Sequence, residues 1–156
     1  MKKILYMTAA LMCLCLASCN KPEPEKHSDM KVLVNGVGVI TKDTTIVIND
    51  AELSLSGDLQ MAVSGEVKGV VDVLKVTITR SATDRIDEFC TGGVCTICDG
   101  ETVQELEFPF KGETASTWYA HYNLPNEGET DYVVSYKFSN YDKSVTLTVH
   151  YDYLED

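Results

Sequence analysis

Apolar and polar residues alternate with a period of two along most of this chain, which is the pattern of strands that bury one face. The alternating runs begin after Met30 and are separated by turn-forming residues such as Asn35-Gly36 and Ser56-Gly57-Asp58. No window of helical length after Met30 carries a convincing helical stripe. The pattern therefore predicts an all-β protein, an antiparallel sandwich of about seven to nine strands that spans residues 31–156. Its core positions include Trp118, Tyr122, Tyr136, Leu147 and Val149.

One long segment, Ser81 to Thr102, lacks this alternation, and we expect it to be an irregular loop. Long loops in compact domains are often functional, so this is where a site is sought first.

The start of the chain has the pattern of an exported protein. Lys2 and Lys3 precede an apolar run from Ile4 to Leu16 that is too short to span a bilayer permanently but suits a signal peptide. Leu16-Ala17-Ser18-Cys19 resembles the lipobox of bacterial lipoproteins. The resemblance implies that residues 1–18 are removed and that Cys19 becomes an acylated N-terminus, whose two or three acyl chains, palmitate among them, anchor it stably. An ordinary signal peptide with a chance cysteine is the alternative.

Residues 19–30 are predicted to be the lipidated cysteine and a flexible, disordered tether, because they contain two prolines and mixed charge and have no large apolar residue before Met30. Asn20 stands where an Asp would resemble an inner-membrane retention signal, so we expect the outer membrane. The periplasmic and the surface-exposed side of that membrane both remain open.

The chain is acidic, with 13 Lys and Arg residues against 24 Asp and Glu residues and a net charge of −11. Removal of Lys2 and Lys3 with the signal peptide makes the mature chain more acidic still. This charge argues against a nucleic-acid partner and against anionic headgroups as ligands of the protein surface. Contact with the membrane is therefore expected through the lipid on Cys19.

Three cysteines, Cys90, Cys95 and Cys98, remain in the mature domain beside Cys19. An oxidising compartment favours one disulfide, and three thiols allow three pairings. Gly92-Gly93 would let Cys90 and Cys95 close a tight loop, whereas Cys95-Thr96-Ile97-Cys98 would pair as a CxxC. We favour a structural staple with a spare thiol over a redox-active CxxC or a zinc site completed by His121 or His150, because the strand-to-helix context of redox motifs is missing and thiolates are disfavoured there.

Several motifs resemble an Ig-like sandwich module of Bacteroidetes secreted proteins and lipoproteins, a family of unknown function. They are Asp87-Glu88-Phe89-Cys90 with Cys95, the Tyr122-Asn123-Leu124-Pro125 corner, and the closing strand Val145–Tyr151. The resemblance covers about residues 59–153. It implies that Cys90 and Cys95 pair, and Cys98, which departs from the pattern, is then a free thiol or an alternative partner. It supplies a fold without catalytic residues.

No hydrolase nucleophile motif, phosphate-binding glycine loop or metalloprotease motif is present, so the sequence predicts a non-enzymatic protein without cofactor or metal. We interpret the acidic clusters near Asp84, Asp99 and Glu127 as solvated surface, with Ca²⁺ binding as the alternative. Exposed aromatic residues suit a protein or glycan partner, or a place in an envelope assembly. The expected contacts are Phe89, Val94, Ile97 and Tyr119. The alternative is a small enzyme, either a CxxC thiol redox protein or a hydrolase that uses loop carboxylates.

Overall fold

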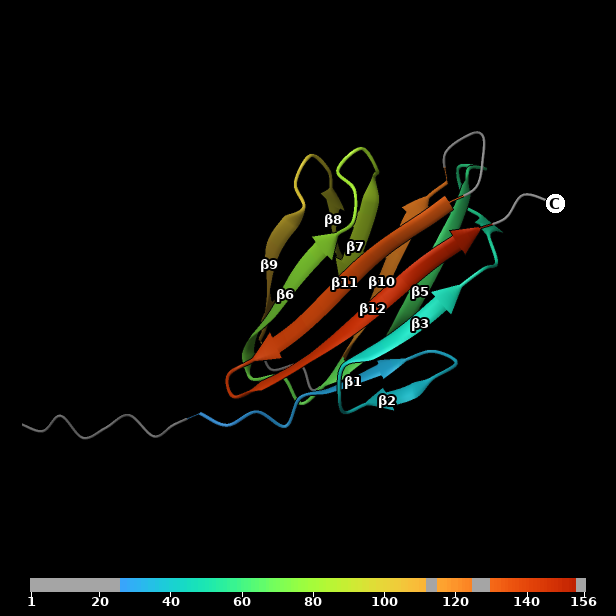
Figure 1. Cartoon of the computed structure of the whole chain (residues 1–156). Helices are drawn as coiled ribbons and strands as arrows, with labels where there is room; N and C mark the ends of the chain where they lie inside the picture. The colour runs from blue at the N-terminus through green and yellow to red at the C-terminus, as the bar shows by residue number, and fades with distance from the viewer. Residues whose placement is uncertain (1–25, 112–114, 125–129, 154–156) are drawn as a thin grey trace, which may run out of the picture.

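The computed structural model describes residues 26–111, 115–124 and 130–153, which form twelve strands and contain no helix (Figure 1). Among these residues, then, nothing forms a long apolar helix that would cross a membrane. The strands are β1 (Lys31–Val34), β2 (Gly38–Ile40), β3 (Thr44–Ile48), β4 (Glu52–Leu53), β5 (Leu59–Lys68), β6 (Asp72–Arg80), β7 (Asp87–Thr91), β8 (Val94–Cys98), β9 (Val103–Phe110), β10 (Ala115–Asn123), β11 (Thr130–Asn140) and β12 (Lys143–Tyr153).

The strands form two sheets that pack face to face (Figure 1). Sheet A has the order β2-β1-β5-β10-β7-β8, and β4 pairs with β5 beside it. Sheet B has the order β3-β12-β11-β6-β9. All pairs are antiparallel except β3 with β12, which run parallel. The predicted all-β sandwich is confirmed. The strand number exceeds seven to nine because the short strands β1, β2 and β4 form beside the long ones, and because β7 and β8 also form.

The core lies between the two sheets, and the five side chains expected there, Trp118, Tyr122, Tyr136, Leu147 and Val149, are all buried. Each lies on a long strand in which every second residue points inward, as the period of two requires. Leu59 also shares the apolar parity of β5, but it is exposed because it is the first residue of that strand.

The prediction of an irregular segment from Ser81 to Thr102 is wrong, because residues 87–98 of it form the hairpin β7–β8. Its two-residue turn, Gly92-Gly93, has φ values of 57° and 76°, which are typical of the type I′ turns that close such hairpins. The apolar alternation is weak here because cysteine, threonine and charged residues occupy most positions of β7 and β8.

The first described residues contact the end of the sandwich. Lys26 Nζ lies 2.7 Å from Asp72 Oδ2, and the backbone N–H of Ser28 donates to Asp142 Oδ1 at 3.0 Å. Residues 26–30 of the expected tether thus lie against the turns that follow β5 and β11. Residues 19–25, which include Cys19, lie outside the described residues, as do the signal peptide and residues 154–156.

Candidate functional site

The side chains best suited to bind a ligand or take part in a reaction lie on the outer face of sheet A, the face turned away from sheet B. Strand pairing sets Glu88 of β7 opposite His121 of β10, and Cys90 opposite Tyr119. On the other side of β7, Cys95 of β8 lies opposite Cys90, and Ile97 opposite Glu88. The sheet therefore gathers residues from three strands into two neighbouring cross-strand rows.

Two shallow depressions hollow this face, and Tyr119 lines both of them. The first, of about 490 Å³, lies between β10 and the β4–β5 turn, and its lining is Ser54, Leu55, Ser56, Asp58, Gln60, Glu88, Tyr119, His121 and Asn123. The second, of about 380 Å³, is lined by Asn35, Ser64, Gly65, Cys90, Thr91, Gly93, Thr117, Trp118 and Tyr119. Together they make a shallow groove whose lining residues are mostly of polar types, and we call it the sheet A groove.

Tyr119 is held in place through its hydroxyl group. Gln60 Nε2 donates to this hydroxyl at 2.6 Å, and the hydroxyl donates to Glu52 Oε1 at 3.3 Å. Burial of the phenol, reinforced by the negative charge of Glu52, raises the pKa of Tyr119 to about 12. The side chain is therefore a neutral phenol near pH 7, oriented by partners from β4 and β5.

His121 lies beside Tyr119, with the two ring centroids 5.4 Å apart. Its side chain is 14% exposed, and Nε2 lies 3.7 Å from Glu88 Oε2. Burial lowers the pKa of His121 below its usual value, despite the opposing effect of the Glu88 and Glu52 charges. A neutral imidazole keeps one donor and one acceptor nitrogen, and Nδ1 has no hydrogen-bond partner among the described residues.

The structure joins Cys90 to Cys95 in a disulfide and leaves Cys98 as a buried thiol. Successive side chains of a strand point to opposite faces, so Cys95 and Cys98, three residues apart on β8, point in opposite directions. Cys98 faces the interior, where burial raises the pKa of its thiol to about 11, and the nearby Asp87 contributes in the same direction. The CxxC alternative thus lacks the juxtaposed sulfur atoms that it requires.

The four expected contact residues do not form one surface. Val94 and Ile97 are 56% and 59% exposed on β8, the edge strand of sheet A, and Tyr119 lies partly exposed in the sheet A groove. The prediction for Phe89 is wrong, because its side chain is completely buried. Phe89 lies between Glu88 and Cys90 on β7 and points inward, where its ring lies 6.2 Å from Trp118 and 5.7 Å from Tyr136.

A buried polar cluster around Arg80 and Asp87 was missed in the sequence analysis. This cluster holds the chain just before β7 and just after β8. Arg80 Nε lies 3.8 Å from Asp87 Oδ2, and both side chains are almost fully buried. The Arg80 guanidinium donates to the backbone carbonyls of Arg85, Cys98 and Glu101. A sequence signal existed, since Arg80 continues the inward positions Leu74, Val76 and Ile78 of β6. A charged residue at a core-facing position of a strand indicates a buried partner.

The acidic clusters do not come together as a cation site in the described residues. Asp87 is buried and accepts a hydrogen bond from the Tyr132 hydroxyl at 2.7 Å, while Glu88 faces the groove. Residues 127–129 of the third cluster lie outside the described residues. Glu88, Cys90 and Cys95 do offer one carboxylate oxygen and two sulfur atoms that all lie within 4.8 Å of one another. The disulfide uses both sulfur atoms in this state.

No protein-family model matches this sequence, and no curated protein matches it either. Among solved structures, the chain is similar to the N-terminal domain of PorA, with a TM-score of 0.49 and 15% sequence identity over 78% of this chain and 96% of that one. It is also similar to a family 123 glycoside hydrolase from Clostridium perfringens, whose structure was analysed for glycolipid glycan hydrolysis, with a TM-score of 0.39 and 9% identity. That match covers 74% of this chain and 23% of the hydrolase, so this chain spans under a quarter of the hydrolase.

Proposed function

We propose that this protein is a non-enzymatic, lipid-anchored module of the bacterial cell envelope that binds a neutral glycan in the sheet A groove. The observation that carries the proposal is the groove itself, where Tyr119 lines both of two adjoining depressions that also present polar side chains. The acylated Cys19 would attach the module to the outer membrane. The resemblance to an Ig-like envelope module agrees with this placement.

The chemistry of the groove favours a glycan over a protein partner. Sugars present many hydroxyl groups, which need donors and acceptors at short spacing, and an aromatic ring offers their C–H faces a stacking surface. The groove supplies serine hydroxyls, the amides of Asn35 and Asn123, the Glu88 carboxylate and the ring of Tyr119. A protein hot spot requires a larger, fully desolvated apolar anchor than this lining provides.

The charge of the chain selects among glycans. Glu88 and Asp58 line the groove, Glu52 lies against Tyr119, and the whole chain carries a net charge of −11. An anionic polysaccharide would be repelled from such a surface. We therefore infer a glycan without carboxylate or sulfate groups.

Isothermal titration calorimetry of the full chain with a panel of neutral oligosaccharides tests this proposal. Replacing Tyr119 by Ala removes the aromatic surface, so we expect at least about tenfold weaker binding, corresponding to about 1.4 kcal/mol. Tyr119→Phe keeps the ring and loses only the hydroxyl contacts with Gln60 and Glu52, so it is expected to bind more tightly than Tyr119→Ala.

Tyr141→Ala is the matched control, because Tyr141 is also partly exposed but lies in the β11–β12 turn, away from the groove. Its binding should equal that of the wild type. If Tyr119→Ala binds as tightly as the wild type, or if the wild type binds no neutral glycan, the groove does not have this role.

Anchoring is tested separately by replacing Cys19 with Ser and fractionating the cells. A lipoprotein requires the cysteine sulfur for acylation, so the variant is expected to remain uncleaved at this site and to lack acyl chains by mass spectrometry. If the variant is still processed and retained in the membrane like the wild type, the lipid anchor on Cys19 is wrong.

A further inference from the structure

The β7–β8 hairpin carries three metal-ligating side chains on one face. Cys90 and Cys95 are direct cross-strand partners, and Glu88 lies two residues before Cys90, so all three point outward from sheet A. One Glu88 oxygen and the two sulfur atoms lie within 4.8 Å of one another. We propose that this hairpin binds one Zn²⁺ ion through Glu88, Cys90 and Cys95 when the Cys90–Cys95 disulfide is reduced.

The spacing of the donor atoms fits a tetrahedral zinc ion. Zn–S bonds of about 2.3 Å and Zn–O bonds of about 2.1 Å place the ligands of a tetrahedral site roughly 3.5–4 Å apart. One Glu88 oxygen and the two sulfur atoms lie within 4.8 Å of one another, so small side-chain movements would bring them to these separations once the disulfide is broken. Two thiolates and one carboxylate are common zinc ligands, and a water molecule would complete the four.

The hairpin holds its ligands in place after reduction. Five residue pairs join β7 to β8, from Asp87 with Cys98 to Thr91 with Val94, and the Gly92 N–H donates to Ser116 Oγ at 3.0 Å. Phe89, between the two ligands of β7, is locked in the core. The backbone that positions the two sulfur atoms therefore does not depend on the disulfide alone, and a pre-ordered site loses less entropy on binding.

The groups around the site suit a cation. His121 Nε2 lies 3.7 Å from Glu88 Oε2 and flanks the carboxylate on the β10 side. The Tyr119 side chain lies opposite Cys90. Cys98 is excluded as a ligand, because it points to the interior from the opposite face of β8.

The chemistry requires a dithiol reductant, such as a thioredoxin-like protein of the envelope. A reductant thiolate attacks Sγ of Cys95, which is exposed, and the Cys90 thiolate leaves. The second reductant thiol resolves the mixed disulfide, so the reductant becomes a disulfide and the hairpin gains two electrons and two protons. Binding of Zn²⁺ then releases the two thiol protons. The disulfide and the zinc site are thus two alternative states of one hairpin.

Anaerobic titration of the full chain with Zn²⁺, and with Co²⁺ as a spectroscopic substitute, tests this site. The reduced wild type, freed of reductant, is expected to bind one ion and to show a thiolate-to-cobalt charge-transfer band with tetrahedral d–d bands. The oxidised protein is expected to show neither. Glu88→Gln should weaken Zn²⁺ binding at least about tenfold, because a neutral amide replaces the carboxylate ligand.

Two cysteine variants separate this site from the other thiols of the chain. Cys90→Ser should lose the charge-transfer band, whereas Cys98→Ser should bind as the wild type does. The proposal is overturned if the reduced wild type binds no ion, if the oxidised form binds equally well, or if Cys90→Ser or Glu88→Gln leaves the affinity unchanged.

Discussion

At the scale of single residues, the unusual feature is a charged group placed where the strand pattern calls for an apolar one. Asp87 points into the core, 2% exposed, between the Tyr132 hydroxyl and the Arg80 guanidinium. Burial raises the pKa of Asp87 to about 6, and the hydrogen bond from Tyr132 and the charge of Arg80 oppose this effect only in part. The folded protein therefore takes up a proton on Asp87 more readily than the unfolded chain does.

This residue predicts a pH dependence of stability. Because the pKa of Asp87 is higher in the folded state than its usual 3.8, its contribution to stability is fully present below about pH 4 and is lost as the pH rises through about 6. The difference between the two pKa values corresponds to about 3 kcal/mol. The free energy of unfolding, measured with urea from about pH 4 to above pH 6, should fall more in the wild type than in Asp87→Asn, which cannot titrate at this position. Parallel stability curves for the two proteins would contradict it.

At the scale of elements, the close approach of three strands of sheet A depends on one glycine. Gly65 of β5 lies opposite Trp118 of β10 on one side and Val34 of β1 on the other. A Cβ atom at this position would lie 1.9 Å from the Leu33 carbonyl oxygen and 2.9 Å from the Trp118 ring. The same carbonyl accepts a hydrogen bond from Trp118 Nε1 at 3.2 Å. The absent side chain therefore lets the indole reach the backbone of β1.

Gly65→Ala is expected to destabilise the fold by about 1–3 kcal/mol, because the added methyl group has to displace a backbone carbonyl and the Trp118 ring. Thermal or urea unfolding followed by tryptophan fluorescence measures the change, since Trp118 reports on this contact. Thr117→Ala, an exposed position on the neighbouring strand, is the control and should change stability by less than about 0.5 kcal/mol. Equal free energies of unfolding for the two variants would show that the strands can move apart to accept the methyl group without loss of stability.

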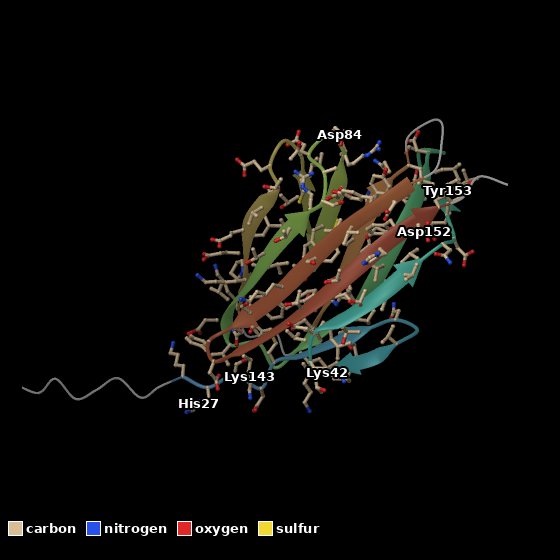
Figure 2. All side chains as sticks on the ribbon, viewed as in Figure 1. His27, Lys42, Asp84, Lys143, Asp152 and Tyr153 are labelled. Atoms are coloured by element: carbon tan, nitrogen blue, oxygen red, sulfur yellow. A yellow bond between two sulfur atoms is a disulfide. The ribbon has the colours of Figure 1, made fainter. Side chains whose placement is uncertain are left out.

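At the scale of the whole molecule, stability comes from the contact between the sheets, and the two ends of the sandwich differ. The described N-terminal segment, which includes His27, lies at the end of the sandwich that carries the β11–β12 turn and Lys143 (Figure 2). Asp84, in the β6–β7 turn, lies at the opposite end (Figure 2). A lipid on Cys19 would therefore place the β11–β12 turn nearer the membrane than the β6–β7 turn.

Leu147 tests the contact between the sheets. Its side chain is completely buried on β12, so Leu147→Ala should lower the free energy of unfolding by about 2–5 kcal/mol through lost burial and a residual cavity. Val47→Ala on the adjacent strand β3 removes a side chain that is 56% exposed and should cost less than about 1 kcal/mol. Urea unfolding compares the two variants. A similar loss in both would mean that the core does not lie between the sheets as described.

The sequence by itself determined the all-β class and which side of each long strand is buried. The reason is that strand periodicity is local. The alternation along a single strand is enough to predict that Trp118, Tyr136 and Leu147 point inward, whichever strands lie beside it. Gly92-Gly93 allowed a tight loop between Cys90 and Cys95, because two consecutive positive φ angles favour glycine, but it left the CxxC pairing of Cys95 with Cys98 open. Where apolar alternation was weak, as on β7 and β8, this local signal failed, and with it the expectation that Phe89 is exposed.

Only the tertiary structure decided which strands are neighbours and in which register. Glu88 and His121 are far apart in sequence and share no local signal, yet the pairing of β7 with β10 sets them opposite one another. The same pairing sets Tyr119 of the groove opposite Cys90. Register depends on long-range contacts and on the packing of one sheet over the other, so a pattern read along one strand leaves it open. The candidate groove follows from that register, and the buried Arg80–Asp87 pair follows from the packing of one sheet over the other.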